Sequence, residues 1–191
     1  QFAFVTFDEA EGAHPFTMSS AWTGDGRLLF LIKALGDYTR TLGHALRVGD
    51  TAIVEGPYGR FHFEGSAQRQ IWIGAGIGVT PFAARVQALA AQPDGRSVDF
   101  FHVTAEVDER ALALLRADAQ AAGVRLHLVV SRRGDTDSLF TGERLRAQVP
   151  DWLQADVWFC GPANFGDALQ QDLVAHGLAP GHFQRELFEM R

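Results

Sequence analysis

The chain has 191 residues, of which 47% are apolar and 21% are charged, and its net charge is −6. These values are typical of a globular protein, and the absence of a Lys/Arg run argues against a nucleic-acid partner. No apolar run approaches the roughly 20 residues that a membrane-spanning helix needs. The single cysteine, Cys160, excludes an internal disulfide.

The first third of the chain has the pattern of a β-rich domain. Thr23–Gly26 has the composition of a hairpin turn, and Tyr38–Leu46 is the one helical pattern in this part. We therefore expect an antiparallel barrel or sheet. Because the chain opens in a strand at Gln1, without a methionine, we also expect it to be a fragment of a longer polypeptide. The predicted strands are Phe2–Phe7, Phe16–Trp22, Arg27–Leu35 and Thr51–Glu55.

From residue 70 onward, apolar strands alternate with helical patterns, which predicts a five-stranded parallel sheet with helices on both faces. Ligands of such sheets bind beyond the carboxyl ends of the strands. Four candidate segments lie at such ends, namely Gly74–Thr80, Thr104–Glu106, Ser131–Arg133 and Cys160–Pro162. The predicted strands are Gln70–Ile73, Ser97–Thr104, Arg125–Ser131, Ala155–Cys160 and His182–Phe188, and the helices are Thr80–Ala91, Glu109–Ala122, Thr141–Gln148 and Ala163–His176.

A glycine-rich turn joins the first of these strands to its helix. Gly74, Gly76 and Gly78 alternate, and we expect Thr80 to cap the helix and Pro81 to occupy its first position. Glycines permit close backbone approach, and the positive end of the helix dipole favours an anion such as a dinucleotide pyrophosphate. The alternative is an ordinary strand-to-helix turn that binds no ligand.

Five motifs occur in a fixed order along the chain: His14–Thr17 with Ser19 and Ser20, Ile32–Thr39, Gly56–Gly59, Gly74–Phe82 and Cys160–Pro162. In their order and spacing the chain resembles the ferredoxin–NADP reductase superfamily, and more narrowly its NADPH oxidase and ferric reductase branch. The resemblance implies a partial FAD-binding β-barrel over residues 1–65, with N-terminal strands missing. It implies an α/β domain over residues 66–191 that binds NADPH, with NADH as the alternative.

The resemblance assigns the flavin site to the first domain. It places Phe16 and Thr17 along the flavin, and the start of the helix near Tyr38 at a pyrophosphate, which favours FAD over FMN. Phe16 in an ordinary strand, His14 as a plain loop histidine and an Asp37-capped surface helix are the alternatives. No metal site is expected, because His14 has no partner at ligand spacing. The flavin-binding residues so implied are His14, Pro15, Phe16, Thr17, Ser19, Ser20, Lys33, Gly36, Tyr38 and Thr39.

The resemblance assigns the nicotinamide end to Cys160, Gly161 and Pro162, with Cys160 helping to align the hydride donor. Phe188 in the closing strand is the candidate aromatic that covers the flavin until the nicotinamide displaces it. The alternatives are a Cys160 that only fills the core and a Phe188 packed between domains.

The resemblance assigns the 2′-phosphate of NADP to Ser131 and Arg132, with Thr104 nearby. Glu106 would repel that phosphate if it pointed inward, and two solvated arginines opening a loop are the alternative reading.

The function that the resemblance implies is an oxidoreductase portion that passes a hydride from NADPH to FAD. Electrons would continue to the haem of an upstream membrane domain of the same polypeptide, and then to ferric iron or oxygen. This places the intact protein on the cytoplasmic side of a membrane, with the fragment itself soluble. Because barrel strands are missing, we expect weak FAD binding or none, and self-association through exposed strand edges. The alternatives are a soluble reductase component for a ferredoxin or an oxygenase, and a non-catalytic nucleotide-binding domain.

Overall fold

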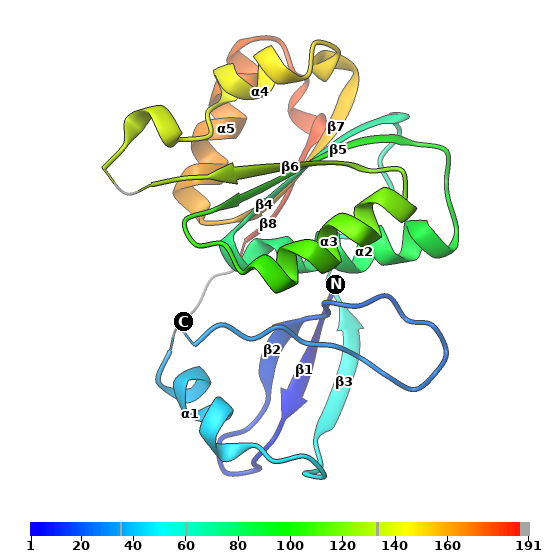
Figure 1. The fold of residues 1–191 in the computed structure, drawn as a ribbon, viewed down its shortest axis with the longest axis vertical. Helices are drawn as coiled ribbons and strands as arrows, with labels where there is room; N and C mark the ends of the chain where they lie inside the picture. Colours follow the sequence, from blue (N-terminus) through cyan, green and yellow to red (C-terminus); the bar gives the residue numbers. More distant parts are fainter. Residues whose placement is uncertain (35, 60, 133, 188–191) are drawn as a thin grey trace.

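The computed structural model describes residues 1–34, 36–59, 61–132 and 134–187, which form two lobes joined by the connection 61–68 (Figure 1). The first lobe comprises residues 1–59, and the second lobe begins at Arg69. The elements of the first lobe are β1 (Phe2–Thr6), β2 (His14–Thr17), α1 (Asp37–Ala45) and β3 (Ile53–Tyr58).

The first lobe is built on an antiparallel sheet in the order β2-β1-β3, with Phe2 beside Thr17 and Val5 beside Val54. Alternate residues of β1 are buried, Ala3 and Val5 being 1% exposed, as a strand with one covered face requires. In contrast, β3 is exposed along its whole length. The sheet agrees with the predicted partial barrel.

The predicted strand Arg27–Leu35 is wrong in its described part, where a single bridge joins Phe30 to Met18. Serine hydroxyls take the place of a regular ladder here. Ser20 Oγ accepts from the Leu29 amide and Ser19 Oγ from the Leu31 amide, both at 3.0 Å. The strand predicted for Phe16–Trp22 accordingly ends at Thr17.

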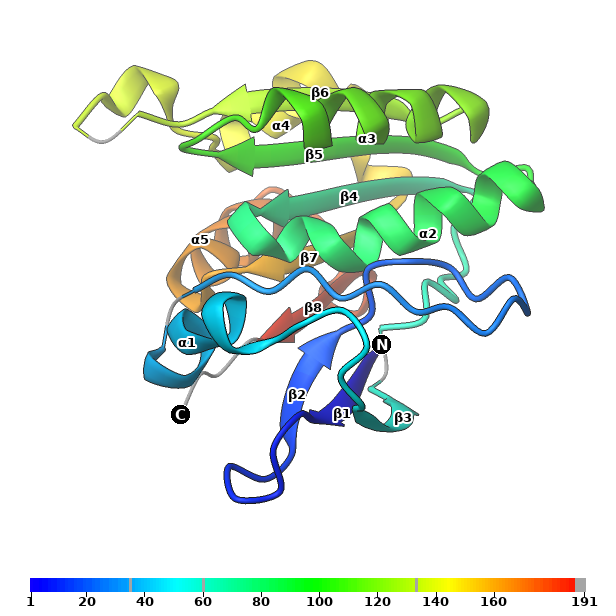
Figure 2. The same ribbon diagram turned by 60° about the horizontal axis from the view of Figure 1, so that its bottom comes forward.

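The second lobe is the predicted parallel sheet, in the order β6-β5-β4-β7-β8. Figure 2 shows α2 and α3 on one face and α4 and α5 on the other. Its strands are β4 (Arg69–Ala75), β5 (Ser97–Thr104), β6 (Arg125–Val130), β7 (Ala155–Gly161) and β8 (Phe183–Leu187). Its helices are α2 (Thr80–Ala91), α3 (Glu109–Ala121), α4 (Gly142–Gln148) and α5 (Ala163–Ala175), with short 3₁₀ turns η1 (Gly76–Val79), η2 (Thr136–Ser138), η3 (Trp152–Gln154) and η4 (Pro180–His182).

The central strands β4 and β7 are buried at every position, because helices cover both faces of the sheet. Side chains therefore alternate between two cores. Ile71 and Ile73 enter the core beneath α4 and α5, whereas Trp72 enters the core beneath α2 and α3. Phe61 and Phe63 of the connection also belong to this second core.

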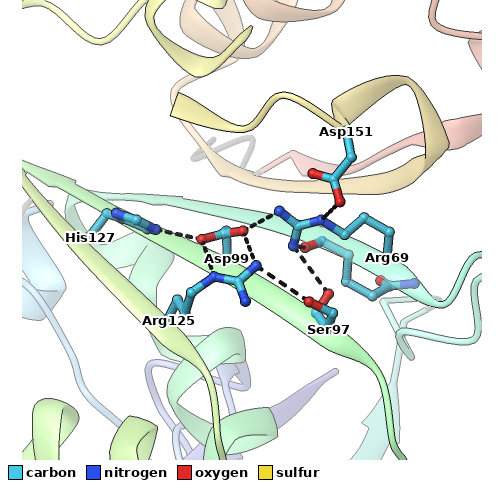
Figure 3. Close-up of polar contacts among 7 residues, drawn as sticks. Arg69, Ser97, Asp99, Arg125, His127 and Asp151 are labelled. Atoms are coloured by element: carbon cyan, nitrogen blue, oxygen red, sulfur yellow. Dashed lines mark hydrogen bonds and ion pairs between the residues drawn. The ribbon is translucent and has the colours of Figure 1, made fainter. Parts of the chain in front are cut away.

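One buried carboxylate links three strands at the edge of the sheet opposite the predicted ligand edge (Figure 3). Asp99 of β5 accepts hydrogen bonds from Arg69 of β4, and from Arg125 and His127 of β6. Arg69 also pairs with Asp151 at 2.9 Å. Burial alone would raise the pKa of Asp99, but the bonds from His127, Arg125 and Arg69 outweigh it and lower the pKa well below its usual range. The cluster links the amino-terminal ends of β4, β5 and β6.

None of the helices formed by the described residues is both long and apolar enough to cross a membrane. Within the same residues, no three His, Cys, Asp or Glu side chains are grouped so that they could hold a metal ion.

Candidate functional site

The carboxyl ends of the parallel strands bring the four candidate segments to one edge of the second lobe. Gly74 lies beside Cys160, Ala75 beside Val103, and Thr104 beside Val130. In Figure 2 the arrowheads of β4, β5 and β6 lie on the same side of the molecule as α1. We call this the glycine edge, formed by residues 74–80, 104–106, 131–132 and 160–162.

The glycine turn packs directly against the end of β7. A Cβ added to Gly78 would lie 2.1 Å from the carbonyl oxygen of Cys160, and one added to Gly161 would lie 2.7 Å from Cβ of Ala75. Contacts this short are impossible for a side chain, so glycine at position 78 is needed for the two segments to meet.

Gly76 has a different role, because a Cβ added there would meet nothing within 4 Å. Its φ of +56° is in the left-handed region. Gly76 opens η1, which runs directly into α2, and the first amides of such a helical run have no partner within the helix. An anion can therefore approach these amides without meeting a side chain.

The predicted helix cap at Thr80 is wrong. Residues 76–79 are already helical, so α2 begins at Thr80 with Val79 as its N-cap, and Pro81 is the second helical residue. Thr80 is instead fully buried, and its Oγ1 has no hydrogen-bond partner among the described residues. A buried hydroxyl without a partner beside an open glycine turn is suited to a ligand.

Cys160 and Glu186 face each other across β7 and β8. Cys160 is fully buried, and burial raises the pKa of its thiol, with the Glu186 charge adding to the effect. Burial also raises the pKa of Glu186, and Oε2 of this residue has no partner among the described residues. Its Oε1 lies 3.3 Å from a Cβ added to Gly59, so Glu186 sits where the two lobes meet. Glu186 could not be identified from the sequence, because its burial follows only from the pairing of β8 with β7.

The segments after β5 and β6 lie side by side, since the Ser131 amide donates to the carbonyl of Thr104 at 2.8 Å. The Thr104 hydroxyl donates to the carbonyl of Glu106 at 2.7 Å, so local structure already uses it. The Arg132 amide donates to Ser138 Oγ at 2.7 Å, and its exposed side chain makes no ion pair with any described residue. Arg133 lies outside the described residues.

In the first lobe, the predicted flavin residues His14 and Tyr38 stack, with ring centroids 3.9 Å apart and an interplanar angle of 16°. Their polar atoms, His14 Nε2 and Tyr38 OH, are buried without a partner among the described residues, and so is Thr17 Oγ1. Burial raises the pKa of Tyr38, with smaller contributions from Glu11 and Asp8. The structure thus brings His14 of β2 and Tyr38 of α1 together, whereas Thr17, three residues from His14 on β2, lies on the opposite face of that strand.

The remaining flavin candidates are arranged less uniformly. Phe16 is half-buried, with its ring centroid 6.3 Å from that of Phe7. Thr39 Oγ1 accepts from the amide of Gly36, the N-cap of α1, at 3.0 Å. The N-cap is therefore Gly36 and not Asp37. Pro15, Lys33 and Gly36 are exposed. The hydroxyls of Ser19 and Ser20 accept hydrogen bonds from the amides of Leu31 and Leu29. Phe188 lies outside the described residues.

A cavity of about 760 Å³ between the lobes does not coincide with the glycine edge. Its walls come from the first lobe, the connection and the middle of α2, including Trp22, Phe61, Phe63 and Arg85. Ser20 and Pro81 are its lining residues from the predicted site, and Arg85 Nε is a buried atom without a partner among the described residues. We place the site at the predicted residues that have unpaired polar atoms, because the cavity includes none of those.

No model of a known protein family matches the chain. It is 26% identical over 212 residues to the glycine betaine monooxygenase reductase subunit of Chromohalobacter salexigens, covering 97% of the chain and 55% of that protein. It is 32% identical over 152 residues to the heme-dependent oxidative N-demethylase beta subunit of Ectopseudomonas mendocina, covering 78% of the chain and 45% of that protein. The chain spans about half the length of these curated relatives.

Two solved structures have the same fold. The ferredoxin reductase in carbazole 1,9a-dioxygenase superposes with a TM-score of 0.79 at 22% identity, over 98% of this chain and 59% of that one. The ferredoxin NADP+ reductase of Neisseria gonorrhoeae, solved with bound FAD and NADP, superposes with a TM-score of 0.76 at 19% identity, over 97% of this chain and 85% of that one.

The chain therefore has the fold of ferredoxin–NADP reductase-like proteins. The fold expected from the motifs is confirmed. None of these four proteins is described as an NADPH oxidase or a ferric reductase.

Proposed function

We propose that the chain is the reductase part of an electron-transfer protein, in which a hydride passes from a nicotinamide dinucleotide to FAD. The observation that carries this proposal is the distribution of buried polar atoms without partners. Such atoms occur on seven side chains among the described residues. His14, Thr17, Tyr38 and Thr80 were predicted from the sequence to bind cofactors, and the others are Glu186, Trp72 and Arg85. Leaving a buried donor or acceptor unpaired costs about 1–3 kcal/mol, which a bound cofactor would recover.

The residues of the first lobe fit a flavin. The His14–Tyr38 stack offers an aromatic surface to a planar ring system, and Thr17 has an unpaired hydroxyl on the opposite face of β2. The start of α1 behind Gly36 is suited to a pyrophosphate, which supports FAD over FMN. When bound, FAD accepts a hydride and releases single electrons. The chain's own residues supply binding, orientation and exclusion of water. Pro15, Phe16, Ser19, Ser20, Lys33 and Thr39 complete the proposed flavin-binding set, with Phe188 as the proposed covering aromatic.

The glycine edge fits the nicotinamide dinucleotide. The open amides at Gly76 receive the pyrophosphate, and Thr80 adds a hydroxyl. Cys160 and Glu186 lie at the junction of the lobes, where the nicotinamide ring would meet the flavin. A thiol that burial keeps protonated aligns the ring without acting as a nucleophile. Gly74, Gly78, Pro81, Gly161 and Pro162 shape this edge.

We favour NADPH over NADH. Arg132 is exposed and unpaired among the described residues, beside Ser131 and close to Thr104, so its guanidinium is available to a 2′-phosphate. Glu106 lies on the same edge, where its negative charge would repel a 2′-phosphate and so disfavour NADPH.

The electron acceptor that we propose is an oxygenase or haem protein. A monooxygenase reductase subunit and the beta subunit of a heme-dependent demethylase are among the relatives, which supports the reductase-component alternative over a membrane oxidase or ferric reductase. The heme-dependent demethylase relative and the membrane-oxidase reading both point to a haem-bearing partner. An upstream membrane domain, with this part on the cytoplasmic side, is retained as the second candidate because the motifs resemble that branch. Self-association through the edge of β3 is proposed for the isolated chain, because that strand is exposed throughout.

The test is FAD titration of the purified chain, followed by anaerobic addition of NADPH while the visible flavin absorption is recorded. We expect saturable, weak FAD binding and loss of the absorption band on reduction. His14→Ala and Thr17→Ala should weaken FAD binding roughly tenfold each, as expected for one lost hydrogen bond. Thr41→Ala, in the exposed part of α1, is the matched control. Bound FAD that NADPH does not reduce would support the non-catalytic alternative, and FAD binding insensitive to both substitutions would refute the proposed site.

A further inference from the structure

The side chains and backbone of the connection make many contacts with the second lobe. Phe61 and Phe63 are only 5% and 6% exposed and pack against Trp72, Phe82 and Trp158, with ring centroids between 5.1 and 5.6 Å apart. Burying a phenylalanine contributes about 1.5–3 kcal/mol. These two rings therefore anchor the connection to the core beneath α2 and α3.

Two arginines of the second lobe add polar contacts to Phe63. Arg96 donates to the Phe63 carbonyl at 2.6 Å, and the Arg85 guanidinium lies 6.0 Å from the centroid of the Phe63 ring. The φ of Phe63 is +61°, a conformation that bulky residues avoid, at a cost of order 1–3 kcal/mol. Such a backbone persists only where its surroundings impose it, and here the second lobe supplies those surroundings.

Asp156, at the start of β7, fastens the other end of the connection. Its Oδ2 accepts from the Ala67 amide at 2.8 Å, and its carboxylate lies so close to Gly65 that a Cβ there would be 2.1 Å away. Its Oδ1 bonds to His182 at 2.7 Å. Gln70 closes the arrangement by donating to the Ala67 carbonyl at 2.8 Å. Asp156 is 4% exposed, so these contacts are shielded from water.

We propose that residues 61–68 are a strap that moves with the second lobe, so that the lobes pivot about Gly59, directly after the pairing of β3 with β1 ends at Tyr58. This would place the domain boundary between residues 59 and 61 instead of at residue 65. Gly59, with a φ of +94°, lies between the first-lobe ring of Phe2 and the second-lobe carboxylate of Glu186. Rotation there would change the distance from Thr17 to Cys160 without disturbing the strap. The consequence for hydride transfer rests on the proposed function, but the strap itself rests only on these contacts.

Distances between pairs of spin labels test the strap without any cofactor. Cysteines are introduced at exposed positions in the first lobe (Glu9→Cys), the strap (Glu64→Cys) and the second lobe (Glu109→Cys), while the buried Cys160 stays unlabelled. We expect a narrow distance distribution for the pair 64–109 and broad ones for 9–109 and 9–64. A broad 64–109 distribution with a narrow 9–64 distribution would assign the strap to the first lobe. Three narrow distributions would rule out a pivot. Either result overturns the proposal.

Two variants test separately the attachment of the strap through Asp156 and the pivot at Gly59. Asp156→Ala should broaden the 64–109 distribution, whereas Asp151→Ala, at the same edge of the sheet but not in contact with the strap, should leave it unchanged. Gly59→Ala should narrow the 9–109 and 9–64 distributions, which both span the pivot, and leave the 64–109 distribution unchanged. In the FAD-loaded chain, Gly59→Ala should lower the hydride-transfer rate roughly 10-fold to 100-fold, with the KM for NADPH within about twofold. If the chain binds no cofactor, the distances still decide whether the strap exists.

Discussion

Gly78 lies so close to Cys160 that the glycine turn and the end of β7 share one backbone-to-backbone contact. Gly78→Ala would force this contact apart, and overpacking of this kind costs roughly 1–3 kcal/mol or more. In a chain of this size we expect the melting temperature to fall by about 2–4 °C for each kcal/mol lost.

Gly76→Ala is the matched comparison, because open space surrounds Gly76 and only its φ opposes a side chain. We expect a loss of about 1 kcal/mol in stability, as for an alanine placed in the left-handed region. The free energy of NADPH binding, measured by calorimetric titration, should weaken by more than the free energy of unfolding does. Equal stability losses in the two variants, or full NADPH affinity in Gly76→Ala, would contradict these assignments.

Asp99→Asn should be strongly destabilising. The substitution leaves Arg69, whose side chain is 10% exposed, without its buried partner. Breaking a buried ion pair typically costs about 3–5 kcal/mol. Asp151→Asn removes the partially exposed partner of the same arginine, for which we expect under about 1 kcal/mol. Urea unfolding measures both, and similar losses in the two variants would disprove the central role of Asp99.

The same carboxylate predicts a dependence of stability on pH. The pKa of Asp99 is lower in the folded chain than its unfolded value of about 3.9, so the charged form stabilises the fold. This contribution is fully present above the unfolded pKa and is lost as pH falls from about 4 toward the folded pKa. The difference in unfolding free energy between wild type and Asp99→Asn should therefore shrink below about pH 4. A constant difference from pH 7 to pH 2 would show that Asp99 does not titrate in this way.

Cys160 should resist thiol reagents in the folded chain. Burial raises the pKa of the thiol, and only the thiolate reacts at an appreciable rate. We expect negligible modification by a disulfide reagent at pH 8 until denaturant unfolds the second lobe, when one thiol per chain should react. Rapid modification under native conditions would mean that the glycine edge opens more readily than its packing indicates.

Arg132→Ala tests the preference for NADPH. Loss of a charge-assisted bond to the 2′-phosphate should raise the KM for NADPH roughly tenfold or more and leave the KM for NADH within about twofold. Arg116→Ala, on α3, is the control of equal charge. Equal effects of Arg132→Ala on both nucleotides would exclude the phosphate role.

The second lobe could be predicted closely from the sequence, because most of its strands are largely apolar runs bounded by helical patterns. The helix bounds Thr80–Ala91 and the strand bounds Ser97–Thr104 agree with the structure at both ends. The predicted strand after Arg27 failed because the Ser19 and Ser20 hydroxyls satisfy backbone amides that a ladder would otherwise use. Thr80 was misread as a cap because nothing in the sequence showed that Gly76–Val79 is already helical.

The site was predictable where it depends on local motifs and hidden where it depends on pairing between strands. The glycine turn and the segment beginning at His14 could be found by their own residues. Glu186 could not, because its position opposite Cys160 follows from the register of β8. Asp99 was equally hidden, since its partners come from strands that are distant in sequence.

The exposure of β3 on both faces means that the first lobe should be less stable to heat than the second. Ile53 and Trp22 of the first lobe are 59% and 64% exposed, whereas the largest side chains of β4 and β7 are sealed from water. Heating should therefore melt the first lobe before the second, giving calorimetry two separate heat-absorption peaks. The aromatic side chains at positions 61 and 63 would then lose their ordered packing only in the later of the two.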